Sequence, residues 1–88
     1  MMVDIVKLKT FLRAAESLNF SDTAKQLHLS QPTVSNQIRL LERELGVVLF
    51  TRTNTGLQLT EGGRLLRPWA HRLLHDTNNM QAMMASIQ

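Results

Sequence analysis

Residues 20–46 constrain the fold more strongly than any other part of the chain. Two segments with the apolar spacing of helices lie there with few residues between them, so we predict two helices joined by a tight turn. Ser30 is a suitable N-cap for the second helix, and Pro32 fits its first turn, where a missing N–H costs nothing. Four apolar residues within an arc about 60° wide predict the buried face of this helix: Val34, Ile38, Leu41 and Leu45.

The opposite face of this helix begins with small neutral side chains, where a solvated helix would normally carry charge. Its candidate base-contacting residues are Gln31, Pro32, Thr33, Ser35 and Asn36. Hydrogen-bond donors and acceptors distinguish base edges in the major groove of DNA, which fixed charge alone does not. Helix capping explains Ser30 and Pro32 equally well, but it does not explain the neutral Ser35 and Asn36 at positions predicted to be exposed. We therefore predict that this end of the helix contacts nucleobases.

The flanking segments predict one further helix and a hairpin. Asp4 is the expected N-cap of a first helix, Asn19 its left-handed end, and Ser21 the N-cap of the next helix. In that next helix three residues are expected to face inward: Ala24, Leu27 and Leu29. Residues 47–50 are strand-like, Gly56 permits a turn, and residues 57–59 alternate like a returning strand. Residues 47–60 are therefore predicted to form a short β-hairpin, or wing.

The C-terminal segment predicts a long helix with an unpartnered apolar stripe. Thr60 with Glu61 marks the start of this helix, which is expected to be roughly 40 Å long and bent at Pro68. The stripe follows heptad-like steps: Leu66, Trp69, Leu73, Met80, Met83 and Ile87. Asp76 interrupts it. A stripe that no later domain covers needs a partner, so we predict a homodimer, either parallel or antiparallel.

Basic and hydroxyl side chains around the second and third helices are candidates for contact with the DNA backbone. The phosphate-contact candidates are Ser21, Thr23, Lys25 and Arg39, and the wing candidates are Arg52, Thr53 and Asn54. For Arg39 and Arg43 the alternative is pairing with Glu42 or Glu44 on the same helix. For Arg52 the alternative is a structural role that pins the hairpin to the helices.

The composition excludes several classes of protein. The chain of 88 residues fits one small domain, and its net charge of +3 permits a polyanionic partner without requiring one. It has no cysteine, which excludes disulfides, thiolate zinc sites and thiol nucleophiles. No apolar run approaches the length of a membrane span and no signal peptide is recognisable. We therefore expect a cytoplasmic protein that makes no contact with a membrane.

Neither an enzyme nor a metal site is predicted. The chain contains no glycine-rich phosphate loop and no nucleophile–base motif. Glu42 and Glu44 diverge on a helix and cannot act as a carboxylate pair. His71 and His75 have the spacing of a two-histidine metal site, but only Asp76 or a second chain could add a ligand. Surface histidines are therefore the better interpretation.

Many residues, taken together, resemble the N-terminal DNA-binding domain of LysR-type bacterial transcriptional regulators. The matching positions are Phe11, Ala14, Ala15, Ser17, Phe20, Ala24, Leu27, Ser30, Gln31, Pro32, Val34, Ser35, Ile38, Leu41, Glu42, Leu45, Gly46, Leu49, Phe50, Arg52, Leu59, Thr60 and Gly63. The resemblance covers essentially the whole chain. It implies a mainly α fold: a winged helix-turn-helix of three helices and a short β-hairpin wing over residues 1–60, then a long dimerising linker helix over residues 61–88.

The same resemblance implies a function. Members of the family bind double-stranded DNA at interrupted palindromes near promoters as homodimers, commonly paired into tetramers, and regulate transcription at the bacterial nucleoid. A small-molecule effector is expected to bind a C-terminal domain outside this chain, so no cofactor is expected within it. The alternative is a winged-helix module that binds a protein. Ionic strength distinguishes the two, because DNA affinity falls steeply with salt and a neutral protein interface hardly responds.

Three positions depart from the family pattern. Asn36 stands where many relatives have a basic residue, and its carboxamide could make paired hydrogen bonds to adenine. Thr55 stands where many have a second basic wing residue, so one phosphate contact is expected to be lost. Gly62 and Gly63 replace the more usual Ala-Gly pair. The additional glycine is expected to loosen the first turn of the last helix by about 1 kcal/mol.

Overall fold

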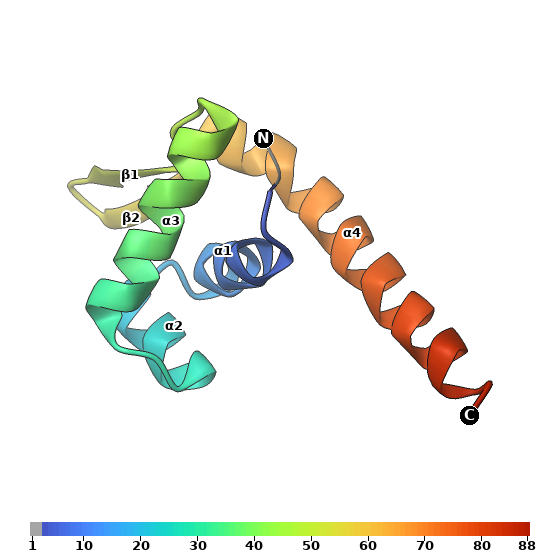
Figure 1. The fold of residues 1–88 in the computed structure, drawn as a ribbon. Helices are drawn as coiled ribbons and strands as arrows, with labels where there is room; N and C mark the ends of the chain where they lie inside the picture. The colour runs from blue at the N-terminus through green and yellow to red at the C-terminus, as the bar shows by residue number, and fades with distance from the viewer. Residues whose placement is uncertain (1–2) are drawn as a thin grey trace.

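The computed structural model describes residues 3–88, which form a helical body, a β-hairpin wing and a projecting last helix (Figure 1). In chain order the elements are α1 (Ile5–Ser17), α2 (Phe20–Leu27), α3 (Gln31–Leu45), β1 (Phe50–Thr53), β2 (Gly56–Leu59) and α4 (Glu61–Ala85). The first two residues of the predicted 1–60 domain lie outside the described residues. The mainly α winged helix-turn-helix with a long last helix is confirmed.

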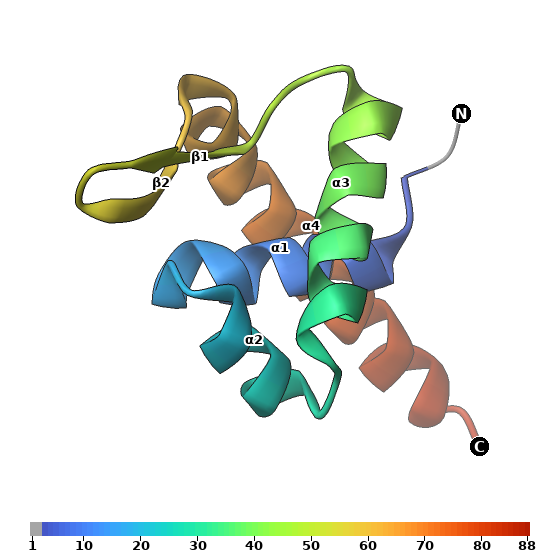
Figure 2. The ribbon, with the colours of Figure 1, turned by 90° about the vertical axis from the view of Figure 1, so that its left-hand side faces the viewer.

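The hydrophobic core is built around α1, which contacts α2, α3 and α4 (Figure 2). Phe11 of α1 and Leu41 of α3 are wholly buried there. The Phe50 ring lies 5.6 Å from the Phe11 ring and 5.4 Å from the Phe20 ring, measured between centroids. Aromatic rings in such tilted and edge-on arrangements attract one another beyond the burial of their area. This cluster fastens the start of the wing to α1 and α2.

The boundary between α1 and α2 differs from the prediction. Asp4 caps α1 as expected, since its Oδ1 accepts the Val6 N–H at 2.9 Å. However, Leu18 with φ 51° ends α1, and the Oδ1 of Asn19 caps α2 by accepting the Asp22 N–H at 2.9 Å. The predictions that Asn19 ends α1 and that Ser21 caps α2 were therefore wrong. Asparagine is as good an N-cap as serine, and Asn19 comes first along the chain.

The turn between α2 and α3 is tight and ends at a capped helix. His28 adopts a left-handed conformation with φ 58°, and Ala24 is buried where α2 meets its neighbours. Leu29 follows the turn and is 37% exposed, so the prediction that it faces inward was wrong. Ser30 caps α3 and Gly46 ends it with φ 70°, both as predicted. The predicted face of α3 is buried, although Leu45 at its end is only partly so.

The wing is an antiparallel pair of strands, shorter than predicted. Its register pairs Phe50 with Leu59 and Thr53 with Gly56, so Asn54 and Thr55 form the turn. Val47 and Val48 are exposed in the connection that precedes β1 and were wrongly predicted as strand. They have no partner strand because the chain beyond Leu59 turns directly into the N-cap of α4.

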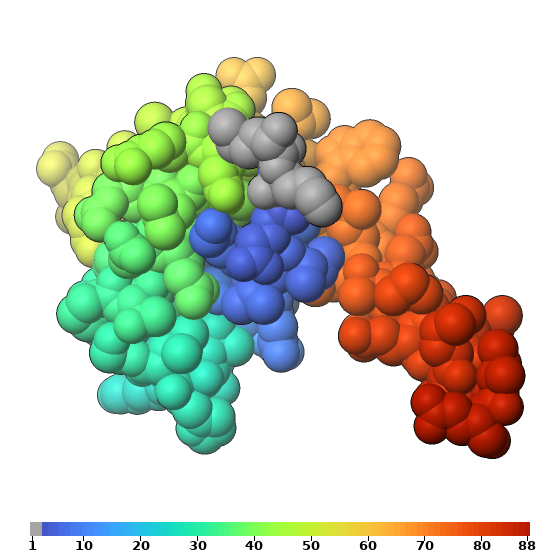
Figure 3. Space-filling model, viewed as in Figure 1, coloured from blue at the N-terminus to red at the C-terminus, as the bar shows by residue number. Residues whose placement is uncertain are grey.

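The last helix projects away from the body and continues through Pro68 to Ala85 (Figures 1 and 3). The Oγ1 of Thr60 caps it by accepting the Gly63 N–H at 3.1 Å, as predicted. Its first half packs against α1, with Ala70 buried and Leu74 partly buried, while buried Gly63 lies against Leu49 and Leu59. Among residues 3–88, no helix has both the length and the apolar composition that crossing a bilayer requires.

Candidate nucleic-acid interface

The first turn of α3 presents the predicted base-contacting residues on a well-capped helix start. We call these residues, Gln31, Pro32, Thr33, Ser35 and Asn36, the uncharged end of α3. The Ser30 Oγ accepts the Thr33 N–H at 3.2 Å and lies 2.8 Å from the Thr33 hydroxyl. Pro32, Thr33 and Asn36 are exposed. These side chains are therefore accessible to a ligand, and the Ser30 cap fixes the backbone that carries them.

Two members of this group are less exposed than predicted. Gln31 and Ser35 are each half-buried, and the Gln31 Nε2 donates to the Ser35 Oγ at 2.6 Å. The expectation of a fully exposed Ser35 was therefore wrong. One helical turn separates the two residues, so their side chains meet on the same face. Ser35 thereby fixes the direction of the Gln31 side chain.

The arginines on the outer face of α3 are not neutralised by the acids of their own helix. The Arg39 Nη2 donates to the Asn36 Oδ1 at 2.8 Å. Glu44 pairs across the core with Lys7, whose Nζ lies 3.2 Å from its Oε2, and Glu42 accepts backbone N–H groups. Within residues 3–88 no ion pair involves Arg43. The alternative in which Glu42 or Glu44 pairs with these arginines is not supported.

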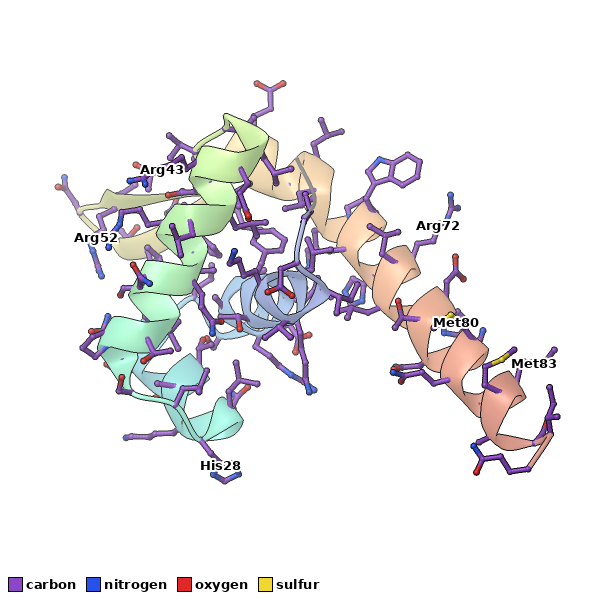
Figure 4. The ribbon with its side chains drawn as sticks, in the orientation of Figure 1. His28, Arg43, Arg52, Arg72, Met80 and Met83 are labelled. Atoms are coloured by element: carbon purple, nitrogen blue, oxygen red, sulfur yellow. The ribbon has the colours of Figure 1, made fainter. Side chains whose placement is uncertain are left out.

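The wing carries an exposed arginine next to a turn that is held by hydrogen bonds. Arg52 is exposed, and no hydrogen bond or ion pair with residues 3–88 restrains it, so a role in pinning the hairpin is not supported. Figure 4 places Arg52 of β1 on the same side of the molecule as Arg43 of α3. The Thr53 Oγ1 accepts the Thr55 N–H and donates to the Gly56 carbonyl, each at 3.2 Å. Thr53 thus shapes the turn, and Asn54 is exposed at its tip.

Thr23 is not available to a phosphate, which corrects the prediction for this residue. Its side chain is wholly buried, and its Oγ1 donates to the Asn19 carbonyl at 2.9 Å and lies 2.8 Å from the Ser17 Oγ. Ser21 and Lys25 are exposed on the outer face of α2 and remain candidates. The helical spacing of Thr23 from Phe20 and Leu27 could have indicated its inward position.

A hollow of about 590 Å³ joins three of the predicted contacts. It lies between the start of α2, the start of α3 and the wing, and Ser21, Gln31 and Arg52 all line it. Residues far apart in the chain, assigned separately from the sequence, therefore face one concave surface. Two residues that support α3 were missed: the Thr10 Oγ1 donates to the Gln37 Oε1 at 2.6 Å and ties α3 to α1. The available signal was the position of Thr10 one helical turn before Ala14, which is buried.

The predicted stripe on α4 is exposed except at its first member. Trp69 is 55% exposed, and Leu73, Met80, Met83 and Ile87 are exposed as well. Met80 and Met83 lie on the part of α4 that projects from the body (Figure 4). Leu66 is instead partly buried against the core of its own chain, so it does not belong to the free stripe. Leu65 beside it is 68% exposed.

The two histidines of α4 lie on a polar groove. His71 and His75 are exposed and line a hollow of about 340 Å³ against α1, which contributes Lys9, Arg13 and Glu16. Within residues 3–88, no three His, Cys, Asp or Glu side chains are placed to hold a metal ion together. The structure therefore gives no support to a metal site at this pair.

The fold and the exposed groups define a winged helix-turn-helix domain of the nucleic-acid-binding type. The family model for bacterial regulatory helix-turn-helix proteins of the lysR family matches residues 5–64. The chain therefore belongs to the lysR family, whose members are transcription regulators and not enzymes, and it corresponds to their DNA-binding domain.

Individual relatives and a solved structure agree with this assignment. The regulator ClcR of Pseudomonas putida is 46% identical over 71 residues, which cover 81% of this chain and 24% of ClcR. CitR of Bacillus subtilis is 43% identical over 86 residues, which cover 98% of this chain and 30% of CitR. The crystal structure of the CbnR DNA-binding domain in complex with DNA is 34% identical, with a TM-score of 0.89 and coverage of 97% of this chain and 98% of that chain. The chain thus spans less than a third of either curated relative.

Proposed function

We propose that this domain binds specific double-stranded DNA sites by inserting the uncharged end of α3 into the major groove. The exposure of Pro32, Thr33 and Asn36 on a capped helix start supports this mode most strongly. The CbnR complex, a protein of the same fold bound to DNA, supports it as well. Phosphate contacts from Ser21, Lys25 and Arg39 fix the position of α3, and Arg52 and Asn54 reach the backbone or the minor groove from the wing.

Binding of a randomised duplex pool followed by sequencing tests this function. A set of enriched sequences with a common half-site is the expected outcome. Affinity for the enriched site should fall steeply between about 50 and 200 mM salt, because each phosphate contact releases counterions. Affinity that is equal for all duplexes, or that is insensitive to salt, would contradict sequence-specific DNA binding.

Replacing Asn36 by alanine is expected to change which sites are bound. A carboxamide can make two hydrogen bonds to adenine, and such a pair contributes about 1–3 kcal/mol of discrimination against the wrong base. The same carboxamide accepts a hydrogen bond from Arg39 in the free protein, so its position is already restrained. Affinities of the variant for a panel of half-sites with single substitutions measure the effect. An unchanged order of preference would remove Asn36 from the base contacts.

Replacing Arg52 by alanine is expected to weaken all sites alike. The guanidinium is exposed and unpaired within the described residues, so its loss removes a cation without disturbing the core. Loss of one phosphate contact should lower the slope of log affinity against log salt by about 0.9. Titrations at four or more salt concentrations measure this slope. A changed site preference with an unchanged slope would place Arg52 at a base instead.

Two copies pair through α4 in antiparallel orientation. A dimer is expected because α4 carries an exposed apolar stripe that no other part of residues 3–88 covers. A parallel pair would set Asp76 against Asp76, which repel each other. An antiparallel pair can instead set Asp76 beside Leu73 and close to Arg72 of the second copy, where opposite charges attract. The interruption of the stripe by Asp76 therefore favours the antiparallel orientation.

The same register fills an apolar hollow at the base of α4. When Leu73 lies beside Asp76 of the second copy, Trp69 meets Met80 and Leu65 meets Met84. Leu65 and Trp69 line a hollow of about 280 Å³ whose other walls include Leu45 and Val47. Methionine side chains adapt to irregular apolar hollows, and the methionines of the second copy reach this one. The resulting dimer recognises an interrupted palindrome whose half-sites are separated by whole helical turns of about 10 base pairs.

The complete regulator carries out the remaining functions of the family. An effector domain binds a small molecule, dimers pair into tetramers, and promoter-bound protein regulates transcription in the bacterial cytoplasm. The similarity to ClcR and CitR, each more than three times as long as the matched segment, supports this extension. Promoter occupancy measured with the full-length protein, with and without candidate effectors, tests it.

A further inference from the structure

The connection between α3 and the wing is held by a carboxylate with no cationic partner among residues 3–88. The Glu42 Oε2 accepts the Leu49 N–H at 2.7 Å and the Phe50 N–H at 3.4 Å. Glu42 lies near the end of α3, and the two amides lie on the far side of the Gly46 cap. One half-buried side chain thus bridges the last turns of the recognition helix and the first residue of β1.

The opposite side of this connection is also fixed. The Thr60 N–H donates to the Leu49 carbonyl at 3.0 Å, and the Thr60 hydroxyl donates to the Val48 carbonyl. The Leu49 side chain is buried, and Phe50 stacks in the aromatic cluster. Leu49 and Phe50 are therefore held from α3 by Glu42 and from α4 by Thr60, which leaves little freedom for the direction of β1.

That direction decides where Arg52 lies. Arg52 follows Phe50 by two residues on the same strand, so the two side chains project from the same face of the wing. Glu42, Arg39 and Arg52 line one hollow of about 230 Å³ between α3 and β1. Glu42 therefore lies beside both cations proposed to meet phosphates, yet its carboxylate is occupied by backbone N–H groups.

We propose that Glu42 is a positioning residue whose carboxylate sets the direction in which β1 leaves α3, and thereby the place of Arg52 beside the uncharged end of α3. The proposal rests on the proposed function, in which Arg52 contacts DNA. In this role Glu42 acts through the hydrogen bonds that its carboxylate accepts, and its negative charge is not required. Removing the Glu42 carboxylate should therefore weaken DNA binding, because Arg52 on the wing would no longer be held in place.

Three substitutions separate these roles. In Glu42→Gln the amide oxygen can still accept both N–H groups, so the slope of log affinity against log salt should stay at the wild-type value. In Glu42→Ala no acceptor remains, and the slope should fall by about 0.9, the loss of one phosphate contact. Adding Arg52→Ala to Glu42→Ala should lower the slope no further. Glu44→Ala is the matched control, because it removes a half-buried carboxylate of the same helix that bonds α1 and not the wing.

Two results would overturn the proposal. The first is a folded Glu42→Ala variant whose slope of log affinity against log salt equals that of the wild type. The second is an equal fall of this slope in Glu42→Gln and in Glu42→Ala, which would show that the charge of Glu42 matters and not its hydrogen bonds. A measurement on the wild-type protein covers the case in which Glu42→Ala does not fold. The Leu49 amide proton should exchange with solvent at least tenfold more slowly than that of exposed Val48, and equal rates would refute the bond. If the wild type binds no duplex, the proposed function fails, whereas amide exchange still tests the role of Glu42 in the free domain.

Discussion

Gly63→Ala is expected to destabilise the domain by about 3 kcal/mol and to lower its melting temperature by more than about 10 °C. A Cβ at this position would press directly against the Leu49 carbonyl oxygen and would lie 2.6 Å from the Leu59 Cδ2. The carbonyl belongs to backbone that Thr60 and Glu42 hold in place. It cannot move aside without breaking the connection to the wing. Thermal unfolding followed by circular dichroism measures the loss.

The adjacent Gly62 provides the control for this prediction. A Cβ there would meet the Val47 Cγ1 and approach the Val48 carbonyl oxygen to 3.2 Å. Val47 is 43% exposed and can rotate toward solvent. The gain of about 1 kcal/mol from replacing a helical glycine offsets this rearrangement, so Gly62→Ala should change stability by less than about 1 kcal/mol. Equal losses in the two variants would show that close packing at Gly63 is not the cause.

Trp69→Ala is expected to raise the dissociation constant of the proposed dimer by a factor on the order of 100, which corresponds to about 3 kcal/mol. Trp69 is the largest side chain on the exposed stripe, and the Arg72 guanidinium lies 5.3 Å from its ring centroid. Burial of an exposed tryptophan within an interface removes a large apolar area from water. Sedimentation equilibrium at micromolar concentration measures the change. Val6→Ala is the control, because Val6 is as exposed as Trp69 but lies on α1.

Cysteine cross-linking tests the orientation of the same dimer. The chain has no native cysteine, so introduced thiols are the only ones present. In the antiparallel register the double variant Leu65→Cys/Met84→Cys should give covalent dimers with a short bismaleimide. Each single variant should not, because identical positions lie about 28 Å apart along the helix axis. Efficient cross-linking of a single variant would indicate a parallel pair.

The elements whose limits depend on local chemistry were predicted well from the sequence. Ser30 and Gly46 enclose α3, and Thr60 starts α4, because caps act through bonds to neighbouring backbone. The error at the start of α2 arose because two residues close together in the chain could both cap a helix. Asn19 and Ser21 are both good caps, and their order along the chain decided between them.

The exposed residues of the candidate site could be predicted from the sequence, whereas the residues that hold them in place could not. The neutrality of Asn36 is visible in the sequence, whereas the burial of Thr23 depends on how α2 rests against α1. From the sequence, Glu42 was considered as a partner for arginines on its own helix and, with Glu44, as a carboxylate pair, but not as a support for the wing. Its bonds to Leu49 and Phe50 arise from a reversal of the chain after Gly46, which local spacing does not reveal.

The central position of α1 sets how far apart two recognition helices can sit in a dimer joined through α4. The Thr10–Gln37 hydrogen bond and the Lys7–Glu44 ion pair tie α1 to α3, and Ala70 and Leu74 belong to the part of α4 that packs on the core around α1, so α1 links the recognition helix to α4 within each copy. In the proposed dimer, this packing and the pairing of the two α4 helices would together set the distance between the recognition helices. A differently spaced operator would then have to be accommodated by the pairing of the α4 helices or by the DNA, and not by separating the recognition helix from α1.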